Sequence, residues 1–148
     1  MDWLDAAKRG KNNIPQTQTK FITLDLVVNR TYGGFCLSRT AMLDLSEMKK
    51  MNLTCFDIEE MKRDDIDLIN VIKKHRDEAS GDIHGIHMKI KVVTLTMNPE
   101  TENCFIRPHG GYDTIYVSSR NKKLYIIDDY GNRKISHCDI INNEIIMV

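Results

Sequence analysis

Residues 21 to 28 alternate between apolar and polar side chains, with the period of two that is typical of a half-buried β-strand. Four apolar residues share one face of this strand: Ile22, Leu24, Leu26 and Val28. The strand is followed by a glycine pair, Gly33 and Gly34. Because adjacent glycines adopt backbone angles that side chains forbid, the sequence predicts a turn here that bends the chain from sheet into helix.

Two amphipathic helices are expected after this turn. Ser38 is placed to accept a hydrogen bond from the first free amides of a helix, and apolar residues recur at three- and four-residue spacing over residues 39 to 51. A second helix is expected to begin at Asp64 or Asp65 and to stop at Ser80-Gly81. The residues between the two helices are mostly polar and predict a link without regular structure.

A long strand is expected over residues 86 to 97, and its apolar pattern changes phase. The even-numbered apolar positions come first: Ile86, Met88, Ile90 and Val92. The odd-numbered ones follow: Val93, Leu95 and Met97. Such a shift predicts either a β-bulge or a second buried face.

The last third of the chain predicts a meander of short strands separated by polar turns. The apolar runs cover residues 114–117, 123–127, 134–138, 140–141 and 145–146. A strand, two helices and then several strands indicate an α+β fold, a mainly antiparallel sheet with two amphipathic helices on one face. We expect a single α+β domain over residues 21 to 148, preceded by an N-terminal arm of residues 1 to 20.

The length and the charge of the chain limit the classes of protein to which it can belong. At 148 residues the chain is long enough to bury one core without disulfides or a structural metal. Its 21 lysines and arginines balance 21 aspartates and glutamates, so there is no long-range attraction for nucleic acid, which is not an expected partner. Membrane insertion is not expected either, because no apolar run reaches the about 18 residues that a spanning helix needs. Residues 1 to 9 carry acids where a secretory signal has bases, which favours an intracellular protein.

Three segments resemble a known family. Residues 29 to 38, Asn-Arg-Thr-Tyr-Gly-Gly-Phe-Cys-Leu-Ser, are similar to the Tyr-Gly-Gly-Phe-x-Leu-Ser motif of small uncharacterised proteins encoded by large DNA viruses and some phages. Arg63-Asp64-Asp65 resembles the family's helix start, with Asp65 at the position of its proline, and residues 88 to 93 resemble a family strand. Gly111-Tyr112-Asp113 resembles an acidic turn of the family. The resemblance covers residues 21 to 117 and implies a viral origin, but it carries no catalytic activity.

The glycine turn is the first candidate site, because exposed amides at a helix start attract anions. A phosphate or nucleotide would be held there by six residues: Arg30, Gly33, Gly34, Ser38, Arg39 and Arg107. The motif lacks the glycine spacing of known nucleotide-binding loops, which favours a purely structural turn. Tyr32 and Phe35 are then expected to fill the core.

Other polar clusters are weaker candidates. Residues 107 to 113 predict a flexible loop that could bind a polar ligand or a partner. His84 and His87, together with His137 and Cys138, could in principle bind zinc, but adjacent ligands on a strand point to opposite faces, so no metal is expected.

No catalytic residue is predicted, because no nucleophile can be paired with a base. The cysteines, Cys36, Cys55, Cys104 and Cys138, are too widely spaced for a Cys-x-x-Cys motif and are expected to be buried thiols. No cofactor is expected.

Together these patterns favour a non-enzymatic viral accessory or virion-associated protein that acts through macromolecular contacts. Trp3 and Leu4, the large apolar residues at the start of the arm, are the expected contacts with a viral or host protein partner. Packing of a short terminal helix on its own domain is the other interpretation of these two residues. The expected location is the host cell cytoplasm or the virion. A small-ligand binder that uses the glycine turn is the alternative function.

Overall fold

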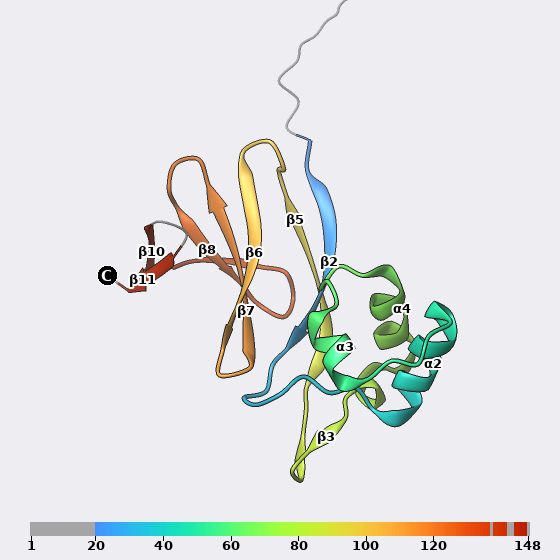
Figure 1. Ribbon diagram of the computed structural model, residues 1–148. Coiled ribbons are helices and arrows are strands. Elements are labelled where there is room, and N and C mark those ends of the chain that lie inside the picture. The colour runs from blue at the N-terminus through green and yellow to red at the C-terminus, as the bar shows by residue number, and fades with distance from the viewer. Residues whose placement is uncertain (1–19, 137, 142–143, 148) are drawn as a thin grey trace, which may run out of the picture.

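A computed structural model describes residues 20–136, 138–141 and 144–147 (Figure 1). Its fold is α+β, as the sequence predicts, and every strand pairing among these residues is antiparallel. Trp3, Leu4 and the rest of residues 1–19 lie outside the described residues. No helix in the described part of the chain is long and apolar enough to cross a membrane.

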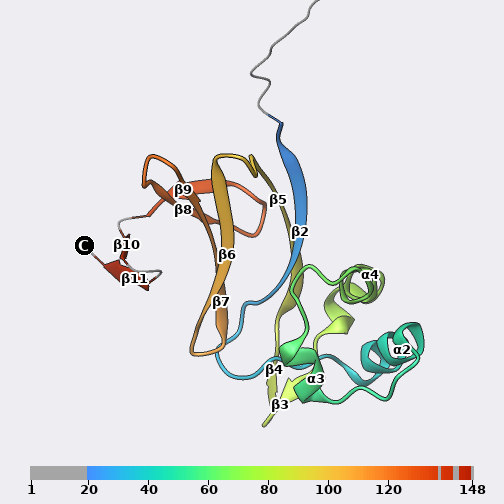
Figure 2. The same ribbon diagram turned by 45° about the horizontal axis from the view of Figure 1, so that its top comes forward.

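A two-stranded ribbon forms the middle layer of the fold. Strand β2 (Ile22–Asn29) pairs with β5 (Ile90–Met97) in one uninterrupted register, from Ile22 opposite Met97 to Asn29 opposite Ile90. The helices cover one face of this ribbon and a second sheet covers the other (Figure 2). The phase change in residues 86 to 97 therefore reflects a second buried face, and β5 contains no bulge in its pairing with β2.

The predicted strand over residues 86 to 97 is divided in two. Its first part, β4 (Ile86–His87), forms a short hairpin with β3 (Asp82–Ile83), and only Ile90–Met97 joins the ribbon. The hairpin turn is formed by His84 and Gly85, both with positive φ, as a two-residue turn matched to strand twist requires.

Both predicted helices are present, and each begins at the expected cap. Ser38 accepts a hydrogen bond from the backbone of α2 (Arg39–Lys49), and Asp65 does the same for α4 (Ile66–His75). A 3-10 helix, η1 (Arg76–Ala79), continues the chain after α4. The link between the helices is partly regular, contrary to the prediction, because Thr54 starts a short helix α3 (Cys55–Glu60). Thr54 and Asp57 form a reciprocal capping box there.

The helical side of the ribbon forms the first hydrophobic core. It joins Val27 and Ile90 of the ribbon to Leu45 of α2, Ile58 of α3 and Leu68 of α4, all of them buried. Phe35 also packs into this core, as predicted. Tyr32 does not, because its ring is 70% exposed.

The other side of the ribbon packs on a four-stranded sheet. Its strands are adjacent in sequence order: β6 (Glu102–His109), β7 (Tyr112–Ser119), β8 (Leu124–Ile127) and β9 (Arg133–Ile135). Ile115 and Val117 of β7 meet Val28, Val93 and Leu95 of the ribbon in a second core. A final hairpin of β10 (Cys138–Ile141) and β11 (Glu144–Met147) completes the predicted meander.

Candidate functional site

Asp113 is a buried carboxylate at the point where the ribbon meets the four-stranded sheet. It is 1% exposed, and its Oδ2 accepts a hydrogen bond from the backbone nitrogen of Asn29 at 2.9 Å. The guanidinium of Arg63, from the segment before α4, lies 3.3 Å from the same oxygen. A buried charge is costly unless it is paired and hydrogen-bonded. Both partners come from segments distant in sequence, so the carboxylate ties three parts of the chain together.

The side chain of Asn29 connects the two glycine-containing segments. Its amide nitrogen donates to the carbonyl oxygens of Gly34 at 3.0 Å and Gly111 at 2.9 Å. Its carbonyl oxygen accepts from the backbone of Thr31 at 3.1 Å. Asn29 is 1% exposed, and because its polar side-chain atoms are satisfied inside the protein, it acts as a structural link.

The two glycine pairs lie in direct contact. The nitrogen of Gly33 donates to the carbonyl of Gly110 at 2.7 Å, and a Cβ on Gly111 would lie 1.6 Å from the carbonyl oxygen of Gly33. Gly33 and Gly111 also have φ values of +117° and +94°, which favour glycine. The glycines thus allow two turns to pack against each other, in addition to bending the chain toward α2.

Residues 107 to 113 do not form the expected flexible loop. Arg107 and His109 belong to β6, and Tyr112 and Asp113 belong to β7, so only Gly110 and Gly111 form the turn between them. Proline and glycine in this segment reflect an edge strand and a two-residue hairpin turn.

The six residues predicted to bind a phosphate have contacts in different parts of the structure. Arg30 donates through Nε to Asp129 at 2.8 Å and through Nη1 to the carbonyl of Asp113. Ser38 Oγ accepts from Ala41 at 3.2 Å, and the nitrogen of Gly33 is used by Gly110.

The other three predicted residues, Arg107, Gly34 and Arg39, each have different surroundings. The guanidinium of Arg107 lies over the ring of Phe105, 5.2 Å from its centroid. Gly34 packs beside Ile83, and Arg39 is exposed at the start of α2.

Asp129 connects Arg30 to the ribbon. Burial alone would raise the pKa of Asp129, but hydrogen bonds from Lys91, at 2.9 Å, and Arg30 outweigh burial and lower it. The carboxylate is therefore ionised at neutral pH and holds both cations in place.

Arg63 has a structural role that its sequence pattern does not predict, since that pattern only resembles a helix start. Its guanidinium lies over the ring of Phe35, 4.4 Å from the centroid. Nη1 of Arg63 is buried and has no hydrogen-bond partner among the described residues, and the negative face of the aromatic ring is its compensating contact. No local pattern identifies this role, because Phe35 and Asp113 are brought to Arg63 by tertiary packing.

Cys36 and Cys104 are poor nucleophiles. Burial raises the pKa of Cys104 to about 11, and burial, followed by the neighbouring Cys55, raises the pKa of Cys36. A catalytic cysteine needs the opposite shift, because the thiolate is the reactive form. Cys36 and Cys104 are partly buried, but Cys55 is exposed, contrary to the prediction of buried thiols.

The histidine cluster does not form a metal centre in the described residues. His87 is hydrogen-bonded to Asp82 at 2.8 Å, and no group of three or more potential metal ligands occurs in the described ranges. His137 and the side chain of Cys138 lie outside them.

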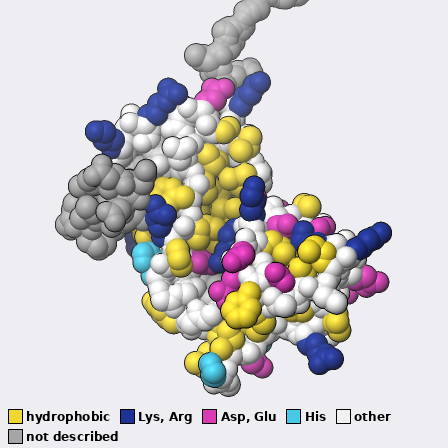
Figure 3. All heavy atoms as spheres, in the orientation of Figure 1, with side chains coloured by type: hydrophobic (Ala, Val, Ile, Leu, Met, Phe, Trp, Pro, Cys, Tyr) yellow, Lys and Arg dark blue, Asp and Glu magenta, His cyan; other side chains and the backbone are white. Residues whose placement is uncertain are grey.

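An open groove lies between β2 and β6. Its volume is about 340 Å³, and its walls are mainly apolar. The lining residues are Leu24, Leu26, Arg63, Asp64, Cys104, Phe105 and Ile106. Figure 3 shows a continuous strip of hydrophobic side chains over this part of the surface. This groove is the candidate macromolecular contact site, and it was not predicted because β6 was not recognised as a strand.

Comparison of the chain with protein-family models, curated proteins and solved structures finds no match.

Proposed function

We propose that the protein is non-enzymatic and acts through macromolecular contacts, by binding an extended segment of a protein partner along the free edge of β6. The observation that supports this proposal is the outer edge of β6, with which no described strand pairs, beside the open apolar groove. Strand addition uses these two features together, since main-chain hydrogen bonds give affinity and side-chain pockets give specificity.

The free edge of β6 is defined by its pairing with β7. The nitrogen of Arg120 donates to the carbonyl of Thr101 at 3.1 Å, just beyond the strand ends. Hydrogen-bonded pairs alternate in an antiparallel ladder, so the next such pair is Asn103 with Ser118. The backbone groups of Cys104 and Ile106 consequently point away from β7, toward the side where a further strand would pair.

At the two ends of this edge, no backbone N–H group is available to a further strand. At one end the nitrogen of Glu102 donates to Asn98 at 2.9 Å. At the other end Pro108 has no N–H group to donate, as is common for proline in edge strands. The available edge is therefore short and centred on Cys104 and Ile106, whose side chains line the groove.

The opposite wall of the groove is β2, and part of its edge is also occupied. The nitrogen of Val27 donates to the carbonyl of Arg63 at 2.8 Å, which closes the groove toward α4. Leu24 is half-buried and lines the groove nearer the start of β2. This arrangement fits an extended peptide with apolar side chains at alternating positions.

The family resemblance makes a viral or host protein the proposed partner class, in the host cell cytoplasm or in the virion. Trp3 and Leu4 are proposed as a second contact with that partner. The partner class, the location and the contact through Trp3 and Leu4 are proposed from the sequence, and none of them depends on the groove.

The test is selection of peptides from a random library on the purified full-length protein, followed by affinity measurement by fluorescence anisotropy. We expect selected peptides to slow amide hydrogen exchange at Cys104 and Ile106 and to bind Ile106→Lys at least tenfold more weakly. Ile135→Lys, at a side chain that is 59% exposed on β9 and does not line the groove, is the control for the added charge. Because Ile106 packs against the second core, the circular dichroism spectrum of Ile106→Lys should first match that of the wild type. Peptides that protect neither amide, or that bind both variants equally, would disprove the proposal.

A further inference from the structure

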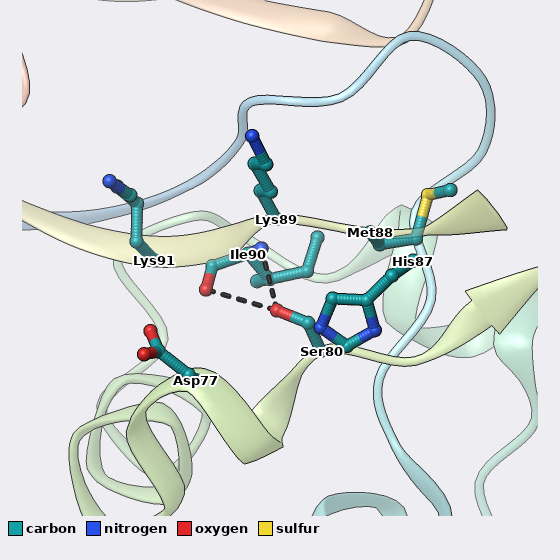
Figure 4. A pocket seen from close by; sticks show the side chains of 7 residues that line it. All are labelled: Asp77, Ser80, His87, Met88, Lys89, Ile90 and Lys91. Atoms are coloured by element: carbon teal, nitrogen blue, oxygen red, sulfur yellow. Dashed lines mark hydrogen bonds between the residues drawn. The ribbon is translucent and has the colours of Figure 1, made fainter.

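The second edge of the ribbon, along β5, has its own hydrogen-bonding pattern. The nitrogen of Arg30 donates to the carbonyl of Lys89 at 2.7 Å, so the alternation places the backbone groups of Ile90 and Val92 on the edge away from β2. Ser80 Oγ occupies this edge at Ile90, accepting from its nitrogen at 2.8 Å and donating to its oxygen at 3.4 Å (Figure 4). Val92, the next outward-facing residue, has no such partner among the described residues.

Two adjoining cavities follow this edge, between β5 and the segment of α4 and η1. Their volumes are about 360 Å³ and 280 Å³, at the lower end of the range for small-molecule sites. They share Asp77, Ile90 and Lys91. Ile90 and Met88 are buried and give the first cavity an apolar floor. The two cavities together form one groove, which we call the β5 groove.

Cations outnumber acids around the β5 groove. Its basic or histidine lining residues are Lys73, Arg76, His87, Lys89 and Lys91, and Asp77 is its acidic one. Figure 4 shows Lys89 and Lys91 extending from β5 away from Asp77. Among the lining residues, this composition favours an anion over a cation as a ligand.

Three of these side chains already have acidic partners outside the groove. Lys73 pairs with Asp25 at 2.8 Å and Lys91 with Asp129 at 2.9 Å, and His87 is bonded to Asp82.

The remaining cations, Arg76 and Lys89, are exposed and make no ion pair within the described part of the chain. Arg76 is therefore available to an anion in the groove without the loss of an existing pair, whereas Lys89 extends to the other side of β5 (Figure 4).

Arg76 also has an unusual backbone. Its φ of 55° and ψ of −128° lie in a region that glycine adopts easily and other residues rarely do. The end of α4 does not depend on Arg76 for its positive charge, since Lys73 and Lys74 are present in its last turn. Strained residues concentrate at ligand sites, and this one lines the β5 groove.

We propose that the β5 groove binds a phosphate-bearing small molecule. Arg76 binds the phosphate oxygens, the N–H of Val92 donates a further hydrogen bond, and the organic part packs over Met88 and Ile90. Arg76 suits this role because its guanidinium can donate two parallel hydrogen bonds to a phosphate. The site lies on the opposite edge of the ribbon from the proposed peptide groove. Gly33, Gly34 and Ser38 do not line it, although the backbone of Lys89 is hydrogen-bonded to Arg30 and Thr31 just before the glycine turn.

The test is calorimetric titration of the full-length protein with ATP, with inorganic tripolyphosphate and with adenosine. ATP binding without tripolyphosphate binding identifies a nucleotide site, and binding of both identifies a polyphosphate site; either result supports the proposal if adenosine binds at least tenfold more weakly. Affinity should fall as sodium chloride is added, because salt screens the cations.

Single substitutions test whether binding occurs in the β5 groove. Arg76→Gly removes the cation at a backbone conformation that glycine adopts easily. Its affinity should fall tenfold or more while its circular dichroism spectrum stays that of the wild type. Arg76→Lys should retain most of the binding, and Lys74→Gln, beside the groove, is the matched control. The peptide-groove variant Ile106→Lys should bind phosphate normally, which separates the two proposals.

Four outcomes would overturn the proposal. The first is that no phosphate probe binds at millimolar concentration, and the second is that Arg76→Gly binds with the same affinity as the wild type. The third is that the ligand changes chemical shifts only at Gly33 and Ser38. The fourth is that binding requires a long oligonucleotide.

Discussion

The backbone nitrogen of Asn29 donates to the carboxylate of Asp113 at 2.9 Å, across 84 positions of sequence. This bond joins the end of β2 to the start of β7, and the side chain of Asn29 holds the two glycine turns on either side of it. The motif that looked most like a binding loop in the sequence therefore connects the middle layer of the fold to the four-stranded sheet.

Replacement of Asp113 by asparagine should destabilise the protein by about 3 kcal/mol, because the guanidinium of Arg63 loses its buried carboxylate partner. Chemical denaturation followed by circular dichroism measures the change. Asp64→Asn, at an exposed neighbour of Arg63, should change stability by less than about 0.5 kcal/mol. Equal effects of the two substitutions would contradict the structural role of Asp113.

Gly111→Ala should destabilise the fold by about 3 kcal/mol or more, since the added Cβ would overlap the carbonyl oxygen of Gly33 and the backbone φ is +94°. Gly85→Ala is the control, because Gly85 has a similar φ of +79° and open space around it. It should cost only the conformational penalty of about 1 kcal/mol. The difference between the two melting temperatures measures the contact between the glycine pairs.

Glu102 should contribute to the acid sensitivity of the protein. Arg133 donates to its two carboxylate oxygens at 2.5 and 2.8 Å and lowers the pKa of Glu102 below its ordinary 4.5. A carboxyl whose pKa is lower in the folded state stabilises the protein above its unfolded pKa, and this contribution is lost as the pH falls through the folded value.

Glu102→Gln should therefore cost about 2 kcal/mol at pH 7, and the difference from the wild type should shrink below about pH 4. Urea denaturation at a series of pH values measures both effects. Glu100→Gln, at an exposed side chain two residues away, should follow the wild-type curve throughout. A constant difference between Glu102→Gln and wild type down to pH 2 would exclude the ion pair as its cause.

Cys104 should be alkylated much more slowly than Cys55 in the native protein. With a pKa of about 11 the Cys104 thiolate is scarce at pH 8, whereas Cys55 is exposed at the start of α3. Peptide mapping after brief treatment with iodoacetamide should find Cys55 labelled first, by a factor of about ten or more. In denaturant the two rates should converge, and equal rates in the native state would contradict the burial of Cys104.

The helix starts and the two strands of the ribbon could be predicted because local chemistry determines them. Ser38 and Asp65 are effective caps wherever an amphipathic stretch follows. The phase change after Val92 left a bulge and a second buried face both possible, and the pairing of β2 with β5 is what decides for the second face. The short helix α3 was missed although the Thr54–Asp57 pair is a recognisable start signal; the helix is only six residues long and has little apolar periodicity.

Strand β6 and the candidate sites could not be predicted, since their features depend on contacts distant in sequence. Pro108 and the two following glycines favour a loop on local grounds, and only pairing with β7 makes this segment a strand. The role of Arg63 depends on Phe35 and Asp113, which local patterns do not bring together. The β5 groove likewise depends on the placement of η1 beside an edge of the ribbon.

The ribbon of β2 and β5 belongs to both hydrophobic cores, and this has a consequence for how the chain comes apart. If the four-stranded sheet detached, Leu26, Val28, Val93 and Leu95 would be exposed to water; if the helices detached, Val27 and Ile90 would be. Neither half can therefore melt alone at low cost, and the helical layer and the meander should unfold in one cooperative step. A fragment that ends after Met97 should be insoluble or unfolded, even though it contains every helix of the described structure.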